Sequence, residues 1–138
     1  MSIKSILSLP FANYIVLKNK KWKNNAIKYQ AKIFNNLIKN GKNTLFGKEH
    51  NFSSVSTYSD FKKRVPINDY EGLSEYIEKI KNGENNILWP KKPIYFCKTS
   101  GTTSGTKYIP ISKESMPNHI VAARDAILSY ISETKNTS

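Results

Sequence analysis

The sequence has a single cysteine, Cys97, which excludes an intramolecular disulfide framework and a multi-cysteine metal site. One free thiol fits a reducing compartment, so we expect a cytoplasmic location. No apolar run approaches the roughly 18 residues that a membrane span requires, and we predict no transmembrane segment. The apolar stretch from Ile3 to Leu17 is interrupted by Pro10 and Asn13, which argues against a secretory signal peptide.

Arginine and acidic residues are also scarce. Among 22 basic residues only Arg64 and Arg124 are arginines, and residues 1–48 contain ten lysines and no acid, so most of the net charge of +12 lies there. Such a block suggests a module that binds nucleic acid or an anionic surface, and this alternative function stays open. Because nucleic-acid sites commonly use arginine, we favour a solvated lysine face. A mitochondrial transit peptide would likewise carry arginines, which residues 1–63 lack.

Hydrophobic periodicity predicts a helical first half. With 38% hydrophobic residues in 138, the chain is rich enough for a globular fold. From Trp22 to Lys39 apolar residues recur every three or four positions before Gly41, which predicts an amphipathic helix whose stripe we assign to the core. We expect residues 42–56 to form a loop.

Two short helices are predicted next, within residues 57–83. Thr57 and Asp60 have the spacing of a capping box, which opens a helix through Arg64. The second helix begins at residue 68 or 69, ends at Gly83 and has an apolar side made of Leu73, Ile77 and Ile80. Residues 85–93 are then a connection.

The last third has a strand, a loop, a strand and a helix. The β-prone runs Ile94–Cys97 and Tyr108–Ile111 flank a polar loop. We expect Cys97 to be buried as a small hydrophobe rather than to be a reactive thiol. Ser112 or Ser115 can then cap a helix with apolar residues at helical spacing: Met116, Ile120, Ala123, Ile127 and Ile131.

The loop from Thr99 to Lys107 is the segment that indicates chemistry. Its nine residues include six with hydroxyl groups, two glycines and one lysine. Glycines let backbone amides approach phosphate oxygens, hydroxyls add donors and lysine adds a positive charge. These are the groups that a polyphosphate needs, although a polar turn without a ligand would have a similar composition.

Other phosphate and hydrolase motifs do not fit the loop. Three residues separate Gly101 from Gly105, whereas a Walker-type loop needs four, and no third glycine opens a helix as in a Rossmann fingerprint. A serine-hydrolase elbow would need serine where Thr103 stands. The isolated His50 and His119 have no cluster of partners, so we expect no protein metal site.

The stretch from Thr99 to Pro110 resembles the first nucleotide-binding motif of the auxin-responsive-promoter family of acyl acid amido synthetases. This family is part of the adenylate-forming superfamily, which includes firefly luciferase and the acyl-CoA synthetases. The resemblance covers about residues 20 to 131 and is most specific from Phe96 to Ile111. Preceding segments resemble bacterial members of the family: Phe46-Gly47, Asp60-Phe61, Val65-Pro66-Ile67 and Asp69-Tyr70-Glu71.

The resemblance implies an ATP-dependent ligase that requires Mg²⁺. A carboxylic acid would react with ATP to give an acyl-adenylate, and an amine or amino acid would then displace AMP to form an amide. It implies that Lys107 is a catalytic residue that stabilises phosphate charge. It also implies that the phosphates are bound by Thr99, Ser100, Gly101, Thr102, Thr103, Ser104 and Gly105.

The implied fold is α/β, and the chain would be an incomplete N-terminal portion of the large adenylate-forming domain. Its parts would be a basic helical segment at 1–45, two short helices at 57–83, a strand–loop–strand element at 94–111 and a helix at 113–132. Members of the family are several times longer, and their adenine, ribose and acyl motifs have no counterpart here. We therefore expect this portion to be inactive alone and to expose apolar surface.

Overall fold

The computed structural model describes residues 3–101 and 105–137, which form two compact units. The first unit comprises residues 1–30 and 114–138, and the second comprises residues 31–113. Most of the described chain is helical, with one small antiparallel sheet, so the α/β expectation is confirmed at this level. Among the described residues, no helix combines the length and apolar character needed to cross a membrane.

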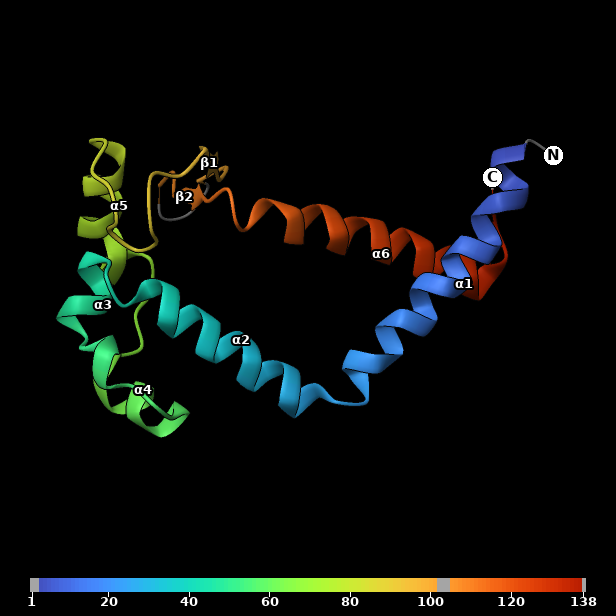
Figure 1. Ribbon diagram of the computed structural model, residues 1–138. Helices are drawn as coiled ribbons and strands as arrows, with labels where there is room; N and C mark the ends of the chain where they lie inside the picture. The colour runs from blue at the N-terminus through green and yellow to red at the C-terminus, as the bar shows by residue number, and fades with distance from the viewer. Residues whose placement is uncertain (1–2, 102–104, 138) are drawn as a thin grey trace. The chain divides into compact units, whose positions relative to one another are not determined.

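In the first unit, helix α1 (Ile3–Lys23) packs against helix α6 (Met116–Thr134) (Figure 1). The helices run antiparallel, because the Ser132 hydroxyl donates to Asn13 Oδ1 at 2.7 Å, while Asn19 on the next turns of α1 contacts the earlier Asp125 of α6. Their shared core consists of Ala12, Ile15 and Leu128, with Ile131 packed against it. Each of these two helices therefore covers one face of the other.

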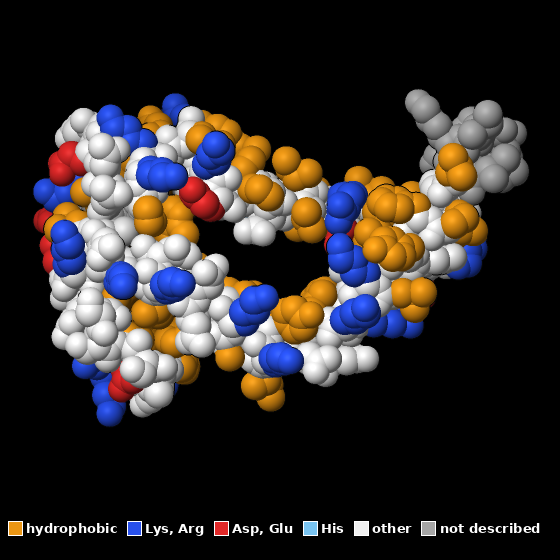
Figure 2. Space-filling view, in the orientation of Figure 1, with side chains coloured by type: hydrophobic (Ala, Val, Ile, Leu, Met, Phe, Trp, Pro, Cys, Tyr) orange, Lys and Arg blue, Asp and Glu red, His pale blue; other side chains and the backbone are white. Residues whose placement is uncertain are grey.

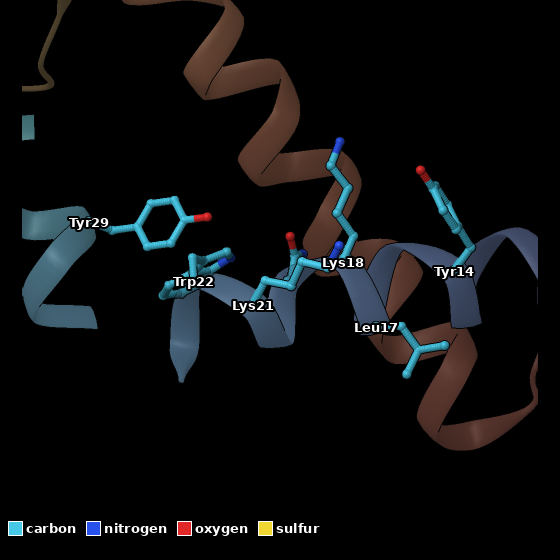
Figure 3. A pocket seen from close by; sticks show the side chains of 7 residues that line it. Tyr14, Leu17, Lys18, Lys21, Trp22 and Tyr29 are labelled. Carbon is cyan, nitrogen blue, oxygen red and sulfur yellow. The ribbon is translucent and has the colours of Figure 1, made fainter. Parts of the chain in front are cut away.

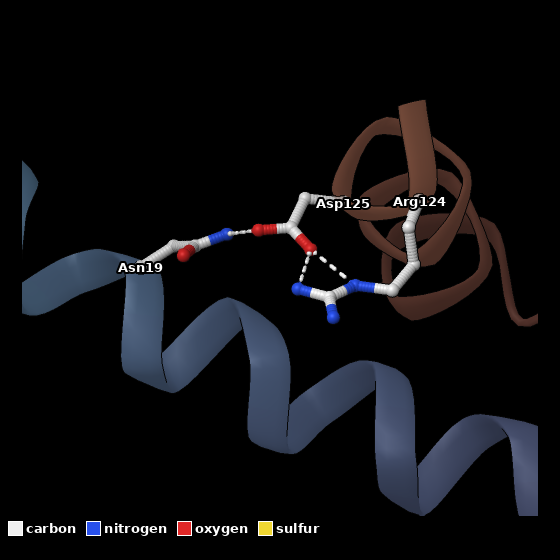
Figure 4. Close-up of polar contacts among 3 residues, drawn as sticks. All are labelled: Asn19, Arg124 and Asp125. Atoms are coloured by element: carbon white, nitrogen blue, oxygen red, sulfur yellow. Dashed lines mark hydrogen bonds and ion pairs between the residues drawn. The ribbon is translucent and has the colours of Figure 1, made fainter. Parts of the chain in front are cut away.

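A polar cluster fixes the same helix pair (Figure 4). Asn19 Nδ2 donates to Asp125 Oδ2 at 2.9 Å, and the Arg124 guanidinium donates to Asp125 Oδ1 at 2.6 and 2.8 Å. The hydrogen bond from Asn19, together with the bonds and charge of Arg124, lowers the pKa of Asp125. The carboxylate is thus kept ionised between the two helices.

In the second unit, the C-terminal part of helix α2 (Ala26–Gly41) leads into α3 (Leu45–Glu49), the 3₁₀ turn η1 (Phe52–Ser54) and α4 (Tyr58–Arg64). Residues 42–56 are therefore not simply a loop, and that prediction is wrong. Thr44 explains the difference, because its buried side chain accepts from Gly47 N at 3.0 Å and donates to Gly41 O at 2.7 Å. The adjoining core contains Ile38, Phe52 and Val55, with Phe34, Phe46, Phe61 and Val65 around it.

The capping box at Thr57 is confirmed. The Thr57 hydroxyl accepts from Asp60 N at 3.1 Å, and the Asp60 carboxylate accepts from Thr57 N at 2.8 Å. These bonds, chiefly those with Thr57, lower the pKa of Asp60. Two otherwise unpaired amides at the start of α4 are thereby satisfied.

The next predicted helix is divided into the 3₁₀ turn η2 (Glu71–Leu73) and helix α5 (Ser74–Lys81). Gly83 has a φ of +88°, so the glycine ends the helical stretch as expected. Ile77 and Ile80 are buried with Ile87 from the connection at 85–93. The connection also joins α3, since Leu45 N donates to Asn86 O at 2.7 Å.

The two predicted strands are present as β1 (Tyr95–Lys98) and β2 (Tyr108–Ile111), which pair antiparallel. Phe96 and Tyr108 pack on the α5 cluster, whereas Cys97 and its cross-strand partner Ile109 are exposed on the other face. The prediction that Cys97 is buried is therefore wrong. Alternation along a strand sends Phe96 and Cys97 to opposite faces, and the face with Cys97 lies open.

The helical stripes are covered less than the periodicity suggested. The helix predicted from Trp22 instead begins at Ala26, after a break at residues 24–25, and Ile27 on its apolar stripe is 84% exposed. On α6 the expected Ile120 and Ile127 are exposed, and Leu128 is buried in their place; other large exposed hydrophobic residues include Ile33 and Leu37. Figure 2 shows such hydrophobic side chains open to solvent. Periodicity identifies an apolar face but not whether another element covers it.

Candidate functional site

The candidate site is the loop that joins β1 to β2. Thr99 N donates to Lys107 O at 3.0 Å, and Lys107 N donates to the Thr99 hydroxyl at 3.1 Å. The first and last residues of the predicted motif are therefore joined directly beyond the strand pair. This double closure fixes where the loop leaves and re-enters the hairpin.

Both glycines of the loop adopt positive φ. Gly101 has a φ of +67° and Gly105 a φ of +82°, a region that side chains disfavour. A Cβ on Gly101 would lie 2.7 Å from Thr106 N and 2.8 Å from Gly105 C, whereas a Cβ on Gly105 would meet open space. Gly101 is thus required by both backbone conformation and close approach, and Gly105 by conformation alone.

Lys107 is half-buried and lies against an aromatic ring. Its Nζ is 5.3 Å from the centre of the Tyr70 ring, and the Tyr70 hydroxyl accepts from Tyr108 N at 2.9 Å. One tyrosine, at the start of η2, therefore contacts the lysine and pairs with the backbone of the following residue. This arrangement limits the positions available to the ammonium group.

The base of the hairpin is fixed by a second aromatic contact. The rings of Phe96 and Tyr108 meet edge to face with centres 6.4 Å apart, and Lys81 Nζ lies 4.8 Å from the centre of the Tyr108 ring. Lys81 also forms a 2.6 Å ion pair with Glu78, which raises the pKa of Lys81. Helix α5 thereby supports strand β2, which begins directly after Lys107.

The structure places the described site residues in one loop. Thr99, Ser100 and Gly105 are exposed, and Gly101 and Lys107 are half-buried. Thr102, Thr103 and Ser104, to which phosphate binding is also assigned, lie outside the described residues. The described groups combine accessible hydroxyls and glycine amides with one positioned ammonium group, a donor set suited to an anion with several oxygens.

Sequence reasoning did not assign Tyr70 to the site. The only signal was its place in the Asp69-Tyr70-Glu71 stretch that carried part of the family resemblance. Its position 37 residues before Lys107 gives no local pattern from which a contact could be read. In residues 3–101 and 105–137, no group of three or more histidine, cysteine or acidic residues could bind a metal ion.

Comparison with known protein families identifies the family of the chain. Residues 18–137 match the GH3 family N-terminal domain. Because this match spans most of the sequence, the chain belongs to the GH3 family.

Several curated plant relatives are similar over part of the chain. Indole-3-acetic acid-amido synthetase GH3.15 of Arabidopsis thaliana is 41% identical over 63 residues, which are 44% of this chain and 11% of the relative. The probable indole-3-acetic acid-amido synthetase GH3.13 of Oryza sativa subsp. japonica is 43% identical over 58 residues, 41% of this chain and 12% of the relative.

A longer alignment is found with indole-3-acetic acid-amido synthetase GH3.2 of Arabidopsis thaliana, which is 30% identical over 89 residues, 63% of this chain and 16% of the relative. The chain thus matches less than a fifth of the length of each of these relatives. No solved structure matches the chain.

Proposed function

We propose that this chain supplies the nucleotide-phosphate loop of an ATP-dependent acid-amido synthetase. The observation that carries the proposal is the closed hairpin loop, in which two glycines at positive φ accompany a lysine placed over Tyr70. Membership of the GH3 family supports it, because the named plant relatives are amido synthetases. We further propose that the full protein is a bacterial-type member of the adenylate-forming superfamily and is cytoplasmic.

The proposed reaction has two balanced steps. A carboxylate oxygen of the acid attacks the α-phosphorus of ATP, the bond to the β-phosphate oxygen breaks, and acyl-adenylate and pyrophosphate form. An amine or amino acid nitrogen then attacks the acyl carbon, AMP departs with the electron pair of the cleaved bond, and the nitrogen loses a proton to give the amide. Mg²⁺ bound to the phosphates would neutralise charge on the leaving pyrophosphate.

The chain's own residues would bind and orient the polyphosphate. The amides next to Gly101 and Gly105 and the hydroxyl of Ser100 would donate to the β- and γ-phosphate oxygens, and the Lys107 ammonium would pair with their charge. The Thr99 hydroxyl accepts from Lys107 N, so its first role is to close the loop. The proposal assigns the same binding role to Thr102, Thr103 and Ser104. No side chain of this chain is assigned to Mg²⁺.

The direct test replaces Lys107 by alanine in the protein that carries this domain. We expect acid-dependent exchange of pyrophosphate into ATP to fall by about 100-fold or more, as when one stabilising charge contact is lost from a transition state. The matched control is Lys113→Ala, which removes an exposed lysine just after β2 and should leave exchange unchanged. Exchange that survives the loss of Lys107 would contradict the assigned role.

A binding measurement on the 138-residue chain separates the loop from the rest of the enzyme. Tripolyphosphate should shift the amide resonances of Gly101 and Gly105 in the NMR spectrum, and Lys107→Ala should weaken the effect, whereas Lys113→Ala should not. If residues of α1 shift instead, the alternative of a basic binding module without catalysis would be favoured. In that case neutralising lysines between residues 18 and 32 should remove salt-sensitive polyanion binding.

A further inference from the structure

Helix α1 has an apolar face that α6 does not cover. Leu7, Phe11, Tyr14, Leu17 and Trp22 are each between 47% and 64% exposed. Leu7, Phe11 and Tyr14 follow four- and three-residue steps, so they share one side of the helix. Lys18 and Trp22 continue this side in steps of four residues, and Leu17 flanks it. The core residues Ala12 and Ile15 point instead to α6. The uncovered face extends about 22 Å along the helix, at 1.5 Å per residue.

The C-terminal end of this face is basic. Lys18, Lys20, Lys21 and Lys23 are all exposed, and residues 1–48 contain no acidic residue. The Asp125 carboxylate of α6, which contacts α1, accepts from Asn19 and from Arg124. The lysines therefore place positive charge beside the apolar side chains, and residues 1–48 contain no carboxylate that could neutralise this charge.

A hollow lies where the apolar and basic parts of α1 meet (Figure 3). Its volume is about 500 Å³, and its lining is Tyr14, Leu17, Lys18, Asn19, Lys21, Trp22 and Tyr29. In Figure 3 the Tyr29 ring faces Trp22, and the side chains of Lys18 and Tyr14 project to the same side. Aromatic rings with polar tips and long lysines at one boundary are the groups that favour a membrane–water interface.

We propose that this face of α1, here called the α1 surface (Leu7, Phe11, Tyr14, Leu17, Lys18, Lys21 and Trp22), docks on an anionic phospholipid surface. The apolar side chains would enter the boundary between headgroups and acyl chains, and the lysines would extend to the lipid phosphates. The helix lies along the surface and does not cross it, consistent with its mixture of apolar and charged residues. This inference goes beyond the ligase function and does not depend on it.

Charge and chemistry favour this occupant over two others. A second copy of the chain would bring another net charge of +12, so like-charge repulsion opposes self-docking at low salt. Nucleic acid would attract the lysines but would offer no apolar layer for Leu7, Phe11 and Leu17. An anionic lipid surface satisfies the positive charge and the apolar side chains together.

The test measures binding of the 138-residue chain to vesicles. Vesicles of phosphatidylcholine mixed with phosphatidylglycerol should sediment the chain, and added salt should weaken the binding, whereas pure phosphatidylcholine should bind at least about tenfold less. With Trp89→Phe as the background, the emission of Trp22 should shift to shorter wavelength on binding. This second readout reports the α1 surface itself.

Matched variants separate this site from general charge. Lys18→Gln with Lys21→Gln should weaken binding about 25-fold, because each lysine near the surface contributes about fivefold. Lys18→Arg with Lys21→Arg should retain it. The control pair Lys62→Gln with Lys63→Gln removes the same charge from α4 and should change binding less than about threefold.

The apolar part is tested by Phe11→Ser with Leu17→Ser, which should abolish the Trp22 shift, whereas Ile67→Ser changes an exposed residue of the other unit and should not. Circular dichroism checks that each variant keeps its helices. Equal binding to both vesicle types, equal losses from the two lysine pairs, or tighter binding to duplex DNA than to anionic vesicles would each overturn the proposal.

Discussion

Gly101 shows how a single residue can fix the geometry of the candidate site. Its φ of +67° and the 2.7 Å approach that a Cβ would make to Thr106 N leave no room for a side chain. Gly105 shares the positive φ but faces open space. The two glycines therefore differ in the reason why glycine is needed, a distinction that the sequence does not reveal.

We predict that Gly101→Ala is more damaging than Gly105→Ala. Gly105→Ala should cost about 1 kcal/mol for the left-handed conformation, and Gly101→Ala should cost more because backbone atoms must move. Thermal unfolding of the two variants measures the difference in their stability. Tripolyphosphate binding should be weakened more by Gly101→Ala than by Gly105→Ala. Equal effects would show that close packing at Gly101 is unimportant.

Tyr76 gives a residue-scale test of pH dependence. The hydrogen bond that its hydroxyl donates to Glu49, with burial and the Glu49 charge, raises the pKa of Tyr76 to about 12. The folded state favours the protonated phenol, so the resulting stability is fully present below the ordinary tyrosine pKa of about 10 and is lost as pH rises through about 12.

In Glu49→Gln the carboxylate charge is removed, and the pKa of Tyr76 should fall toward its ordinary value. Ultraviolet absorbance of tyrosinate during an alkaline titration measures this, with Tyr76→Phe identifying which of the eight tyrosines is responsible. Glu75→Gln is the control, because Glu75 makes the smallest contribution to the shift. An unchanged titration in Glu49→Gln would contradict the assigned cause.

At the scale of helices and strands, the sequence predicted the elements that depend on residues close together in the chain. The capping box at Thr57, the glycine stop at Gly83 and the strands on either side of the loop depend on residues a few positions apart, and all are present. Helix α3 was missed because it has five residues and depends on a distant segment, with Leu45 N donating to Asn86 O. The contact of Lys107 with Tyr70 was missed for the same reason.

Helix α1 contains a proline that local rules would place at a break. Pro10 is exposed and lies inside the helix. The helix continues past it, although proline has no backbone N–H to donate to the carbonyl of residue 6. The packing of Ala12 and Ile15 on α6 offsets this local cost. Tertiary contacts thus offset the effect of a proline inside a helix.

We predict that Pro10→Ala stabilises the first unit. The new amide can donate to the carbonyl of residue 6, and alanine is favoured over proline inside a helix by about 3 kcal/mol, of which we expect about 1–3 kcal/mol in the protein. Hydrogen exchange of α1 amides should slow accordingly. Pro117→Ala is the control, because proline in the first turn of α6 costs little and its replacement should have a small effect. Equal slowing in both variants would contradict the argument.

At the scale of the whole molecule, charge and apolar exposure act in opposite directions. The net charge of +12 repels copies of the chain, whereas exposed residues such as Ile27, Ile33 and Ile127 favour association. Figure 2 shows the mixture, with lysine and arginine side chains interspersed among hydrophobic ones. Repulsion is long-range and screened by salt, but apolar contact is neither.

We therefore predict that the isolated chain self-associates as salt rises. At low ionic strength repulsion should keep it monomeric, and above about 0.1 M, where the screening length falls to about 10 Å, the apolar residues exposed on α2 should bring copies together. Sedimentation velocity across a salt series measures this. Ile33→Ser with Leu37→Ser should suppress the association, because both residues are exposed on α2. The control Lys32→Arg changes an exposed residue of the same helix but keeps the charge and both apolar side chains. Association that weakens with salt would instead indicate ionic contacts between copies, since added ions screen attraction between opposite charges as they do repulsion.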